Sequence, residues 1–143
     1  MLTVLLPIDG SEHSGRTVEH FIKSLAWYKD GVEVHLLNVQ HPIPGGHRVA
    51  AALGHEKLQQ YHHDEGMQAL QSARGKLDAA GIAYGFHIGV GEPAVVIAQY
   101  ARDKKCELIV IGARGVGAIE GLLLGSVVTK VIHLADVPVL VVK

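Results

Sequence analysis

The residues of this chain that could do chemistry are concentrated in one glycine-rich stretch, Gly112–Ser126, which reads GARGVGAIEGLLLGS. Gly112 and Gly115 allow the backbone to approach another group closely, because they lack the Cβ atom that would prevent it. Gly125 and Ser126 open a helical pattern, and the free N–H groups at the start of a helix favour a bound anion. The stretch therefore predicts a phosphate-binding loop.

A second candidate residue is Asp9, which follows the first aliphatic run of the chain in the segment PIDGS. A carboxylate only accepts hydrogen bonds, so it suits ribose hydroxyls better than phosphate. Arg114 can add positive charge to the glycine loop, and Ser126 can add a hydroxyl. A sugar-binding acid beside a phosphate-binding loop predicts a nucleotide site. Asp9 taken alone could instead cap a turn with Gly10 and Ser11.

Three better-known phosphate motifs do not fit this stretch. A P-loop needs lysine and then serine or threonine after its second glycine, whereas alanine and isoleucine follow Gly117. The dinucleotide fingerprint G-x-G-x-x-G would start at Gly115 and Gly117 and would require its third glycine at position 120. The chain has its next glycine one residue later, at Gly121, so the motif fails. A receiver-type phosphorylation site needs an acidic cluster, and only Asp9 is present.

The elements that must position these residues alternate along the chain between strands and helices. Ser11 and Ser126 are expected to cap the first and last helices, and Pro93 to lie in the first turn of the third. Short aliphatic runs typical of strands buried on both faces are residues 2–8, 32–39, 108–111 and 139–142. Helical apolar faces are formed by Val18, Phe21, Ile22 and Leu25; by Leu70, Ala73 and Leu77; by Ile97, Tyr100 and Ala101; and by Val127, Val128, Val131 and Ile132.

This alternation predicts an α/β fold with a five-stranded parallel sheet and helices on both faces. In residues 82–90, large apolar side chains alternate with small or polar ones, which is typical of a half-exposed strand at a sheet edge. The strand order 3-2-1-4-5 is therefore favoured, with ligands binding outside the carboxyl ends of the adjacent strands 1 and 4. Residues 40–53 are expected to be irregular and to be mobile or act as a lid.

Composition narrows the class of protein. The 143 residues fit a single domain over 1–143, and the formal net charge of -1 argues against nucleic-acid and anionic-membrane surfaces. Cys106 is the single cysteine, so no internal disulfide can form, and a buried structural thiol is expected. The N-terminus has neither a signal peptide nor a membrane span, which together with the free thiol predicts a cytoplasmic protein.

Histidine is frequent, with 10 residues, and three of them lie in one segment at His55, His62 and His63. His55 and His62 are about two helical turns apart, too far to hold one metal ion without help from elsewhere. We interpret the segment as a solvated helix face, with a metal site as the alternative.

The pattern G-x2-G-x9-G-S of Gly112, Gly115, Gly125 and Ser126 resembles the phosphate-binding signature of the universal stress protein family. The segments LLPIDGSEHS, ELIVIGARGVG and LADVPVLVVK are also similar to that family and occur in its order along essentially the whole chain. The resemblance implies a single-domain Rossmann-like fold of the adenine-nucleotide α-hydrolase-like kind. It also implies a homodimer through the last strand and a site for ATP, ADP or AMP, with or without Mg²⁺, that lacks a dedicated catalytic apparatus.

The resemblance assigns roles by position. Pro7, Ile8 and Asp9 resemble the adenine and ribose contacts, and Val39 resembles the residue whose backbone reads the adenine edge. The residues that resemble the ribose and phosphate contacts are Gly112, Arg114, Gly115, Gly125, Ser126 and Val127.

The chain departs from the family at Val128, where a second hydroxyl residue is common. Thr129 lies about 100° further round the helix and is not expected to replace it. The departure removes an expected contact to the outer phosphates of ATP, so AMP or ADP remain as alternative ligands.

We therefore expect the chain to bind adenine nucleotide (ATP) at the carboxyl ends of strands 1, 2 and 4 and to act as a nucleotide-responsive stress or regulatory homodimer with an unknown protein partner. Whether the chain is an enzyme stays open, with slow ATP hydrolysis at most, because no general base is evident. Val128 favours the alternative of a dimer that binds no nucleotide and works in protein interactions or as a chaperone. A Mg²⁺-dependent phosphohydrolase at Asp9 is a second alternative, against which the single carboxylate argues. The apolar residues 121–124 either fold back onto the domain or face a partner.

Overall fold

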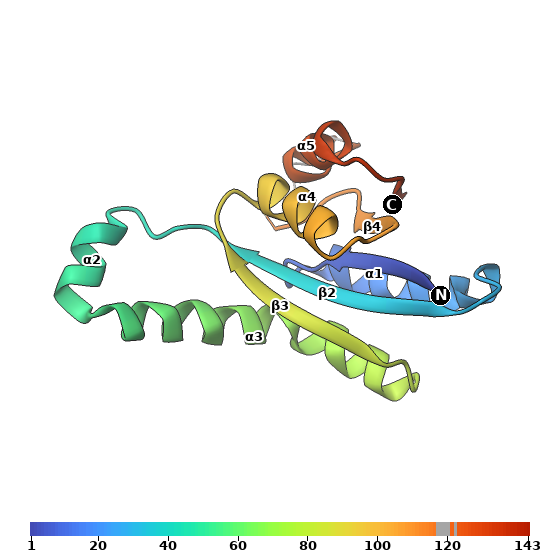
Figure 1. Ribbon diagram of the computed structural model, residues 1–143, viewed down its shortest axis with the longest axis horizontal. Coiled ribbons are helices and arrows are strands. Elements are labelled where there is room, and N and C mark those ends of the chain that lie inside the picture. The colour runs from blue at the N-terminus through green and yellow to red at the C-terminus, as the bar shows by residue number, and fades with distance from the viewer. Residues whose placement is uncertain (117–120, 122) are drawn as a thin grey trace.

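The computed structural model describes residues 1–116, 121 and 123–143, so Gly117 and Leu122 of the glycine loop lie outside the described residues. Within the described residues, five parallel strands form one sheet in the order β3-β2-β1-β4-β5 (Figure 1). The strands are β1 Leu2–Pro7, β2 Val32–Gln40, β3 Tyr84–Val90, β4 Leu108–Gly112 and β5 Val139–Val142. The helices are α1 Glu12–Lys23, α2 Gly46–Leu53, α3 His55–Ala79, α4 Pro93–Asp103 and α5 Ser126–Leu134. The predicted fold class and strand order are confirmed.

Each face of the sheet carries its own hydrophobic cluster. Successive strand residues point to opposite faces, so Leu6 and Leu36 contribute to one cluster while Leu5 and Leu37 contribute to the other. Helices α1 and α3 cover the first face, and α4 and α5 cover the second (Figure 1). The continuous aliphatic runs of the central strands follow from this arrangement, because both of their faces are buried.

The helix starts agree with the sequence in two of three cases. Ser11 is the N-cap of α1 and accepts a hydrogen bond from the Ser14 N–H at 3.2 Å, while Pro93 occupies the first turn of α4. The expected cap at Ser126 is wrong, because Gly125 takes the non-helical cap conformation (φ -75°, ψ 169°) and Ser126 is the first residue of α5. An N-cap needs backbone angles outside the helix, and the turn into α5 places that requirement on the glycine.

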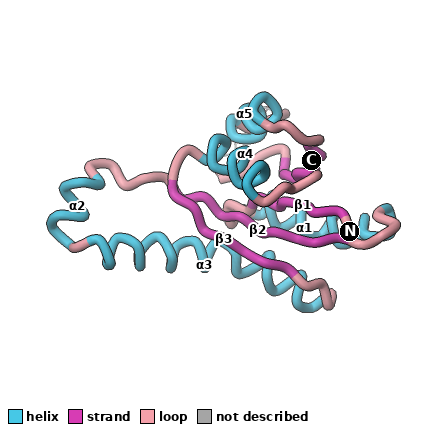
Figure 2. Tube along the Cα trace, viewed as in Figure 1, coloured by secondary structure: helices cyan, strands magenta, loops and turns pink. Residues whose placement is uncertain are grey.

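The expectation of an irregular segment over residues 40–53 is also wrong in its second half. Residues 46–53 form α2, and only the short piece between β2 and α2 is a loop, which runs away from the sheet (Figure 2). The run of alanines before Leu53 has the highest intrinsic helix propensity, whereas the prolines of the segment, Pro42 and Pro44, precede the helix. Helix α2 packs against α3, and with the amino-terminal part of α3 it forms an arm that extends beyond the sheet, whereas the rest of α3 packs on the sheet.

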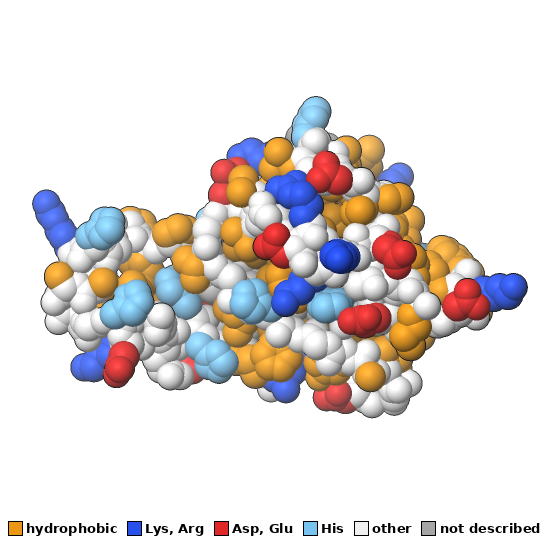
Figure 3. Space-filling model, viewed as in Figure 1, with side chains coloured by type: hydrophobic (Ala, Val, Ile, Leu, Met, Phe, Trp, Pro, Cys, Tyr) orange, Lys and Arg blue, Asp and Glu red, His pale blue; other side chains and the backbone are white. Residues whose placement is uncertain are grey.

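The histidine segment is only partly a solvated face. His55 and His63 are exposed as expected, and Figure 3 shows several histidine side chains on the arm. His62 is buried, with 8% of its surface exposed, because it continues the stripe of Gly66 and Leu70 by which α3 faces the sheet. The interpretation is therefore wrong for His62. In the described part of the chain, no group of three or more His, Cys, Asp or Glu side chains could hold a metal ion.

Two glycines of α3 have opposite expected effects when replaced by alanine. A Cβ at Gly66 would lie 2.5–2.7 Å from side-chain atoms of Ile88 on β3, whereas a Cβ at Gly75 would meet nothing within 4 Å. Gly66→Ala is expected to lower the free energy of unfolding by about 1–3 kcal/mol through overpacking. Gly75→Ala is expected to raise it by about 1 kcal/mol through helix propensity. Urea unfolding of both variants measures this, and a stabilised Gly66→Ala would contradict the close packing of α3 on β3.

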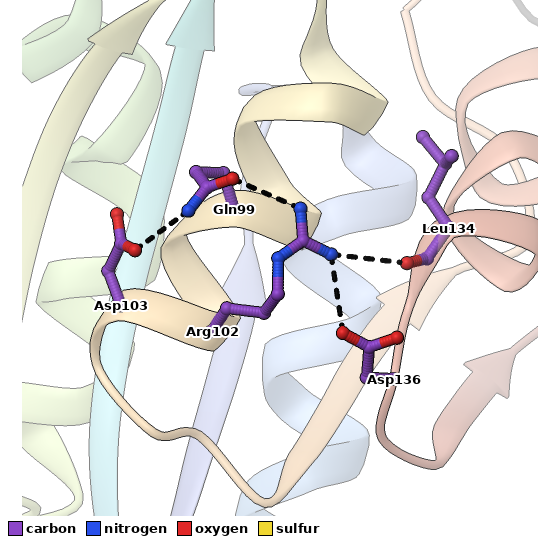
Figure 4. Close-up of polar contacts among 5 residues, drawn as sticks. All are labelled: Gln99, Arg102, Asp103, Leu134 and Asp136. Atoms are coloured by element: carbon purple, nitrogen blue, oxygen red, sulfur yellow. Dashed lines mark hydrogen bonds and ion pairs between the residues drawn. The ribbon is translucent and has the colours of Figure 1, made fainter.

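Helices α4 and α5 are tied together near their carboxyl ends by Arg102 (Figure 4). Its guanidinium donates to the Leu134 carbonyl at 3.5 Å, to Asp136 at 3.4 Å and to the Gln99 side chain at 3.1 Å. A cation at the last carbonyls of α5 also complements the helix dipole. This contact holds side by side the two helices whose amino-terminal ends border the cavity described below.

None of the described helices is both long and apolar enough to cross a bilayer.

Candidate functional site

A cavity of about 420 Å³ opens at the carboxyl ends of β1, β2 and β4 and at the amino-terminal ends of α4 and α5. Its size is within the range of small-molecule sites. All of the site residues expected from the sequence line it: Pro7, Ile8, Asp9, Val39, Gly112, Arg114, Gly115, Gly125, Ser126 and Val127.

Asp9 joins the end of β1 to the glycine loop. Its Oδ1 accepts hydrogen bonds from the Ser11 N–H at 2.9 Å and from the Ser11 hydroxyl at 2.6 Å. Its Oδ2 accepts from the Val116 N–H at 2.8 Å, across 107 residues of sequence. The turn-capping role is thus present, and the same carboxylate also fixes the glycine loop. Asp9 is exposed and faces the cavity, where it can still accept from a ligand hydroxyl.

Gly112 and Gly115 are required by contacts within the protein. A Cβ at Gly115 would overlap Oδ2 of Asp9, so only glycine lets the loop reach that carboxylate. A Cβ at Gly112 would lie 2.9 Å from Oγ1 of the fully buried Thr17, so glycine there lets α1 pack on β4. Neither glycine has a positive φ, so close approach rather than backbone freedom explains both.

The amino-terminal end of α5 forms the wall of the cavity opposite Asp9. The first backbone bond within this helix turn runs from the Thr129 N–H to the Gly125 carbonyl at 3.1 Å. The amides of Ser126, Val127 and Val128 therefore have no acceptor inside the helix, and no side chain of the described residues caps them. These amides and the positive end of the helix dipole favour an anion in the cavity.

Val39 offers a backbone donor and acceptor at the end of β2. In a parallel ladder, the N–H and C=O of one residue point to the same neighbouring strand, and successive residues alternate. Leu37 faces β1, because its carbonyl accepts from the Ile8 N–H at 2.8 Å, and Gln40 faces β3, because its carbonyl accepts from the Gly91 N–H at 2.9 Å. Val39 therefore faces β1, which ends at Pro7, and no described backbone group pairs with its N–H or C=O.

Sequence reasoning missed several lining residues, most notably Asn38 and Gln40. Asn38 is only 2% exposed. In the sequence it is a polar residue that interrupts an aliphatic run directly before Val39, an expected ligand contact, and this position is the signal by which it could have been identified. The other missed residues are Ser14, Leu37, His41, Pro93, Ile97, Ile111, Val116 and Val128. Most of these are apolar and are indistinguishable in sequence from core residues.

The departure at Val128 has a structural meaning. Val128 is 2% exposed and belongs to the cluster beneath α4 and α5, so its side chain serves packing as well as the cavity wall. The Thr129 hydroxyl donates to the Gly125 carbonyl at 2.8 Å and does not line the cavity. Thr129 thus does not replace the missing hydroxyl, as expected.

Two groups with raised pKa values lie away from this cavity. Burial raises the pKa of the Cys106 thiol above its usual value, and the charge of Glu33 adds to the effect. Burial also raises the pKa of the Tyr100 phenol. Cys106 is buried as expected, and the raised pKa keeps it protonated at neutral pH. Neither group lines the cavity, so neither supplies a nucleophile there.

Comparison with known proteins agrees with this geometry. The whole chain, residues 1–143, matches the model of the universal stress protein family. Universal stress protein MJ0531 of Methanocaldococcus jannaschii is 32% identical over 141 residues, which cover 98% of this chain and 81% of that protein. The solved structure of MJ0577 from the same organism has a TM-score of 0.81 at 27% identity, covering 99% of this chain and 95% of that one. A universal stress protein solved in complex with cAMP has a TM-score of 0.66 at 26% identity, covering 99% and 96%. The chain belongs to the universal stress protein family.

Proposed function

We propose that this protein binds an adenine nucleotide in the cavity at the carboxyl ends of β1, β2 and β4. The observation that carries the proposal is the convergence of three different groups on one cavity: the Val39 backbone edge, the Asp9 carboxylate and the amino-terminal end of α5. The Val39 backbone suits a base, the Asp9 carboxylate suits ribose hydroxyls, and the amino-terminal end of α5 suits a phosphate. The cAMP complex of a relative with 26% identity supports the same class of ligand.

The binding mode follows from the chemistry of each group. Adenine presents an acceptor at N1 beside a donor at N6, which complements the N–H and C=O of Val39. The ribose hydroxyls donate to Asp9, whose geometry is held by Ser11 and by the Val116 amide. The first phosphate sits on the amides of Ser126 and Val127, with Arg114 beside it.

The number of phosphates is limited by the charge of the cavity. Among the described lining residues, Arg114 is the single lysine or arginine, and Asp9 offsets it. A monophosphate can be satisfied by the α5 amides and Arg114, whereas the outer phosphates of ATP add negative charge without a matching hydroxyl at position 128. We therefore expect AMP to bind at least as tightly as ATP, and Mg²⁺ to narrow the difference by neutralising the outer phosphates. Asp9 is assigned a binding role, because both of its oxygens already accept hydrogen bonds from the protein.

Thermal unfolding with added nucleotide tests this proposal. AMP at about one hundred times its dissociation constant should stabilise the protein by about 2.7 kcal/mol, which raises Tm by several degrees. GMP at the same concentration is the matched control and should give a much smaller shift. The Tm shifts with ADP and with ATP, each measured with and without Mg²⁺, show how much the second and third phosphates add to or subtract from binding. The absence of a shift with every adenine nucleotide would overturn the proposal and favour a family member that acts through protein interactions alone.

We further propose that a second copy of the chain pairs with the free edge of β5. Leu140 and Val142 face β4, since the Val142 carbonyl accepts from the Ala113 N–H at 2.7 Å. The N–H groups of Val139 and Val141 therefore point to the outer edge, where no described strand pairs with them.

Val141→Pro should remove one outward donor without touching the ladder to β4, and light scattering should show the monomer. Lys143→Ala at the same end of the strand is the control and should leave the dimer intact. A monomeric wild type, or a dimeric Val141→Pro, would contradict the β5 interface.

Regulation is assigned to the loop that the nucleotide contacts. Leu123 and Leu124 are 65% and 36% exposed, so these two leucines of residues 121–124 face solvent rather than fold back fully onto the domain, while Leu122 lies outside the described residues. Val116 in the same loop is 75% exposed. Because Val116 is bonded to Asp9, a ligand on Asp9 acts directly on the loop that carries these apolar side chains. The partner they suit is an apolar protein surface.

A further inference from the structure

The ladder between β1 and β2 ends with a side chain in place of a backbone donor. The Ile8 N–H donates to the Leu37 carbonyl at 2.8 Å, as a regular parallel ladder requires. The next bond of such a ladder would run from the Val39 N–H to the Ile8 carbonyl. That carbonyl instead accepts from the side-chain Nδ2 of Asn38 at 2.9 Å.

The Asn38 amide is fixed at both ends. Its Oδ1 accepts from Nε2 of Gln40 at 2.6 Å, and the Gln40 carbonyl is held by the Gly91 N–H at 2.9 Å. Asn38 is 2% exposed and lines the cavity together with Gln40. A buried amide whose donor and acceptor are both used is strongly oriented, because leaving either unpaired costs about 1–3 kcal/mol.

We propose that Asn38 is a positioning residue that determines base specificity by occupying the Ile8 carbonyl and so leaving the Val39 N–H to the ligand. Ile8 is 3% exposed, so without that side chain its carbonyl would be a buried acceptor, and the Val39 N–H is the donor that a continued parallel ladder would supply to it. The proposal rests on the proposed function for its ligand. The competition between the Asn38 side chain and the Val39 N–H for the Ile8 carbonyl is independent of any ligand.

The chemistry fixes which base is selected. A free Val39 N–H beside the Val39 carbonyl offers a donor and an acceptor to the edge of a purine. The 6-amino edge of adenine complements this pair, whereas a 6-oxo purine presents a donor at N1 and an acceptor at O6, which is the reverse arrangement. If the Val39 N–H turned to Ile8, only its carbonyl would remain, and the distinction between AMP and IMP would shrink.

The first measurement is amide hydrogen exchange of the protein without nucleotide. In the wild type, the Val39 amide should exchange rapidly for a strand residue. In Asn38→Leu, the Val39 amide should pair with Ile8 and exchange about tenfold more slowly, the effect expected of one hydrogen bond. Asn38→Ser is the second variant, because serine is too short to reach Ile8 and removes the bond without adding bulk. Unchanged or faster exchange at Val39 in both variants would overturn the proposal.

The second measurement is the affinity for AMP, IMP and ribose 5-phosphate by calorimetry. The wild type should prefer AMP to IMP, and both variants should lose about tenfold in AMP affinity with no change for ribose 5-phosphate. Ser24→Ala is the matched control, because Ser24 is also 2% exposed and donates to a backbone carbonyl at 2.9 Å, far from the cavity. It should cost stability without changing the AMP-to-IMP ratio. Equal losses for AMP and ribose 5-phosphate would reduce Asn38 to a structural role and overturn the inference. A wild type that binds none of the three overturns the nucleotide proposal itself, while the exchange data still decide the competition for Ile8.

Discussion

Replacing Gly115 by alanine is expected to lower the affinity for AMP at least about tenfold and the free energy of unfolding by about 1–2 kcal/mol. The added Cβ would overlap Oδ2 of Asp9, so the carboxylate must leave its bond to the Val116 N–H. That bond spans 107 residues and joins the loop after β1 to the loop after β4. Breaking it displaces the proposed ribose contact and the start of the phosphate loop together. Calorimetry with AMP and urea unfolding measure the two effects.

Two further variants make this prediction specific. Asp9→Asn replaces Oδ2 by an amide nitrogen that cannot accept from Val116, so it should reproduce the loss without adding bulk. The double variant should be little worse than either single one, because both remove the same contact. Gly85→Ala on β3 is the control, since a Cβ there meets nothing within 4 Å. Additive losses for Gly115→Ala and Asp9→Asn would show that the two residues act separately and would contradict the proposed link.

Ser126→Pro is expected to lower the affinity for AMP about tenfold or more while leaving the fold intact. Proline is favoured at the first position of a helix, and Gly125 already has the extended backbone that a residue before proline requires. The substitution removes the Ser126 N–H, and a hydrogen bond to a charged group contributes about 1.5–3 kcal/mol. Ser126 is exposed, so little packing is lost.

The matched control is Ser126→Ala, which removes the hydroxyl and keeps the amide. The difference in AMP affinity between the two variants isolates the backbone donor. Adenosine serves as a second control, because it lacks the phosphate and should bind both variants equally. Equal AMP affinity for Ser126→Pro and Ser126→Ala would show that the phosphate does not use the amide of α5.

The sequence by itself determined the elements of the sheet and their order. Strands buried on both faces need continuous aliphatic runs, and the alternation in residues 82–90 marks a strand with one open face, so the pattern fixes β3 at an edge. The glycine loop could likewise be found from residue types and spacing, because a helix start with glycine before it is a local feature. All ten site residues inferred from these patterns and from the family resemblance border one cavity.

Only the tertiary structure decided what several of these residues contact. Gly112 and Gly115 are glycines because Thr17 and Asp9, close to the other end of the chain, approach them, and no local pattern records such a contact. His62 is buried because α3 lies along the sheet, although its sequence neighbours are polar. The N–H and C=O of Val39 are free because the neighbouring strand β1 ends at Pro7 and because the Asn38 side chain donates to the Ile8 carbonyl, which would otherwise accept from the Val39 N–H. Propensity and periodicity are properties of neighbouring residues, whereas these contacts depend on where distant segments stop, which is settled only when the sheet assembles.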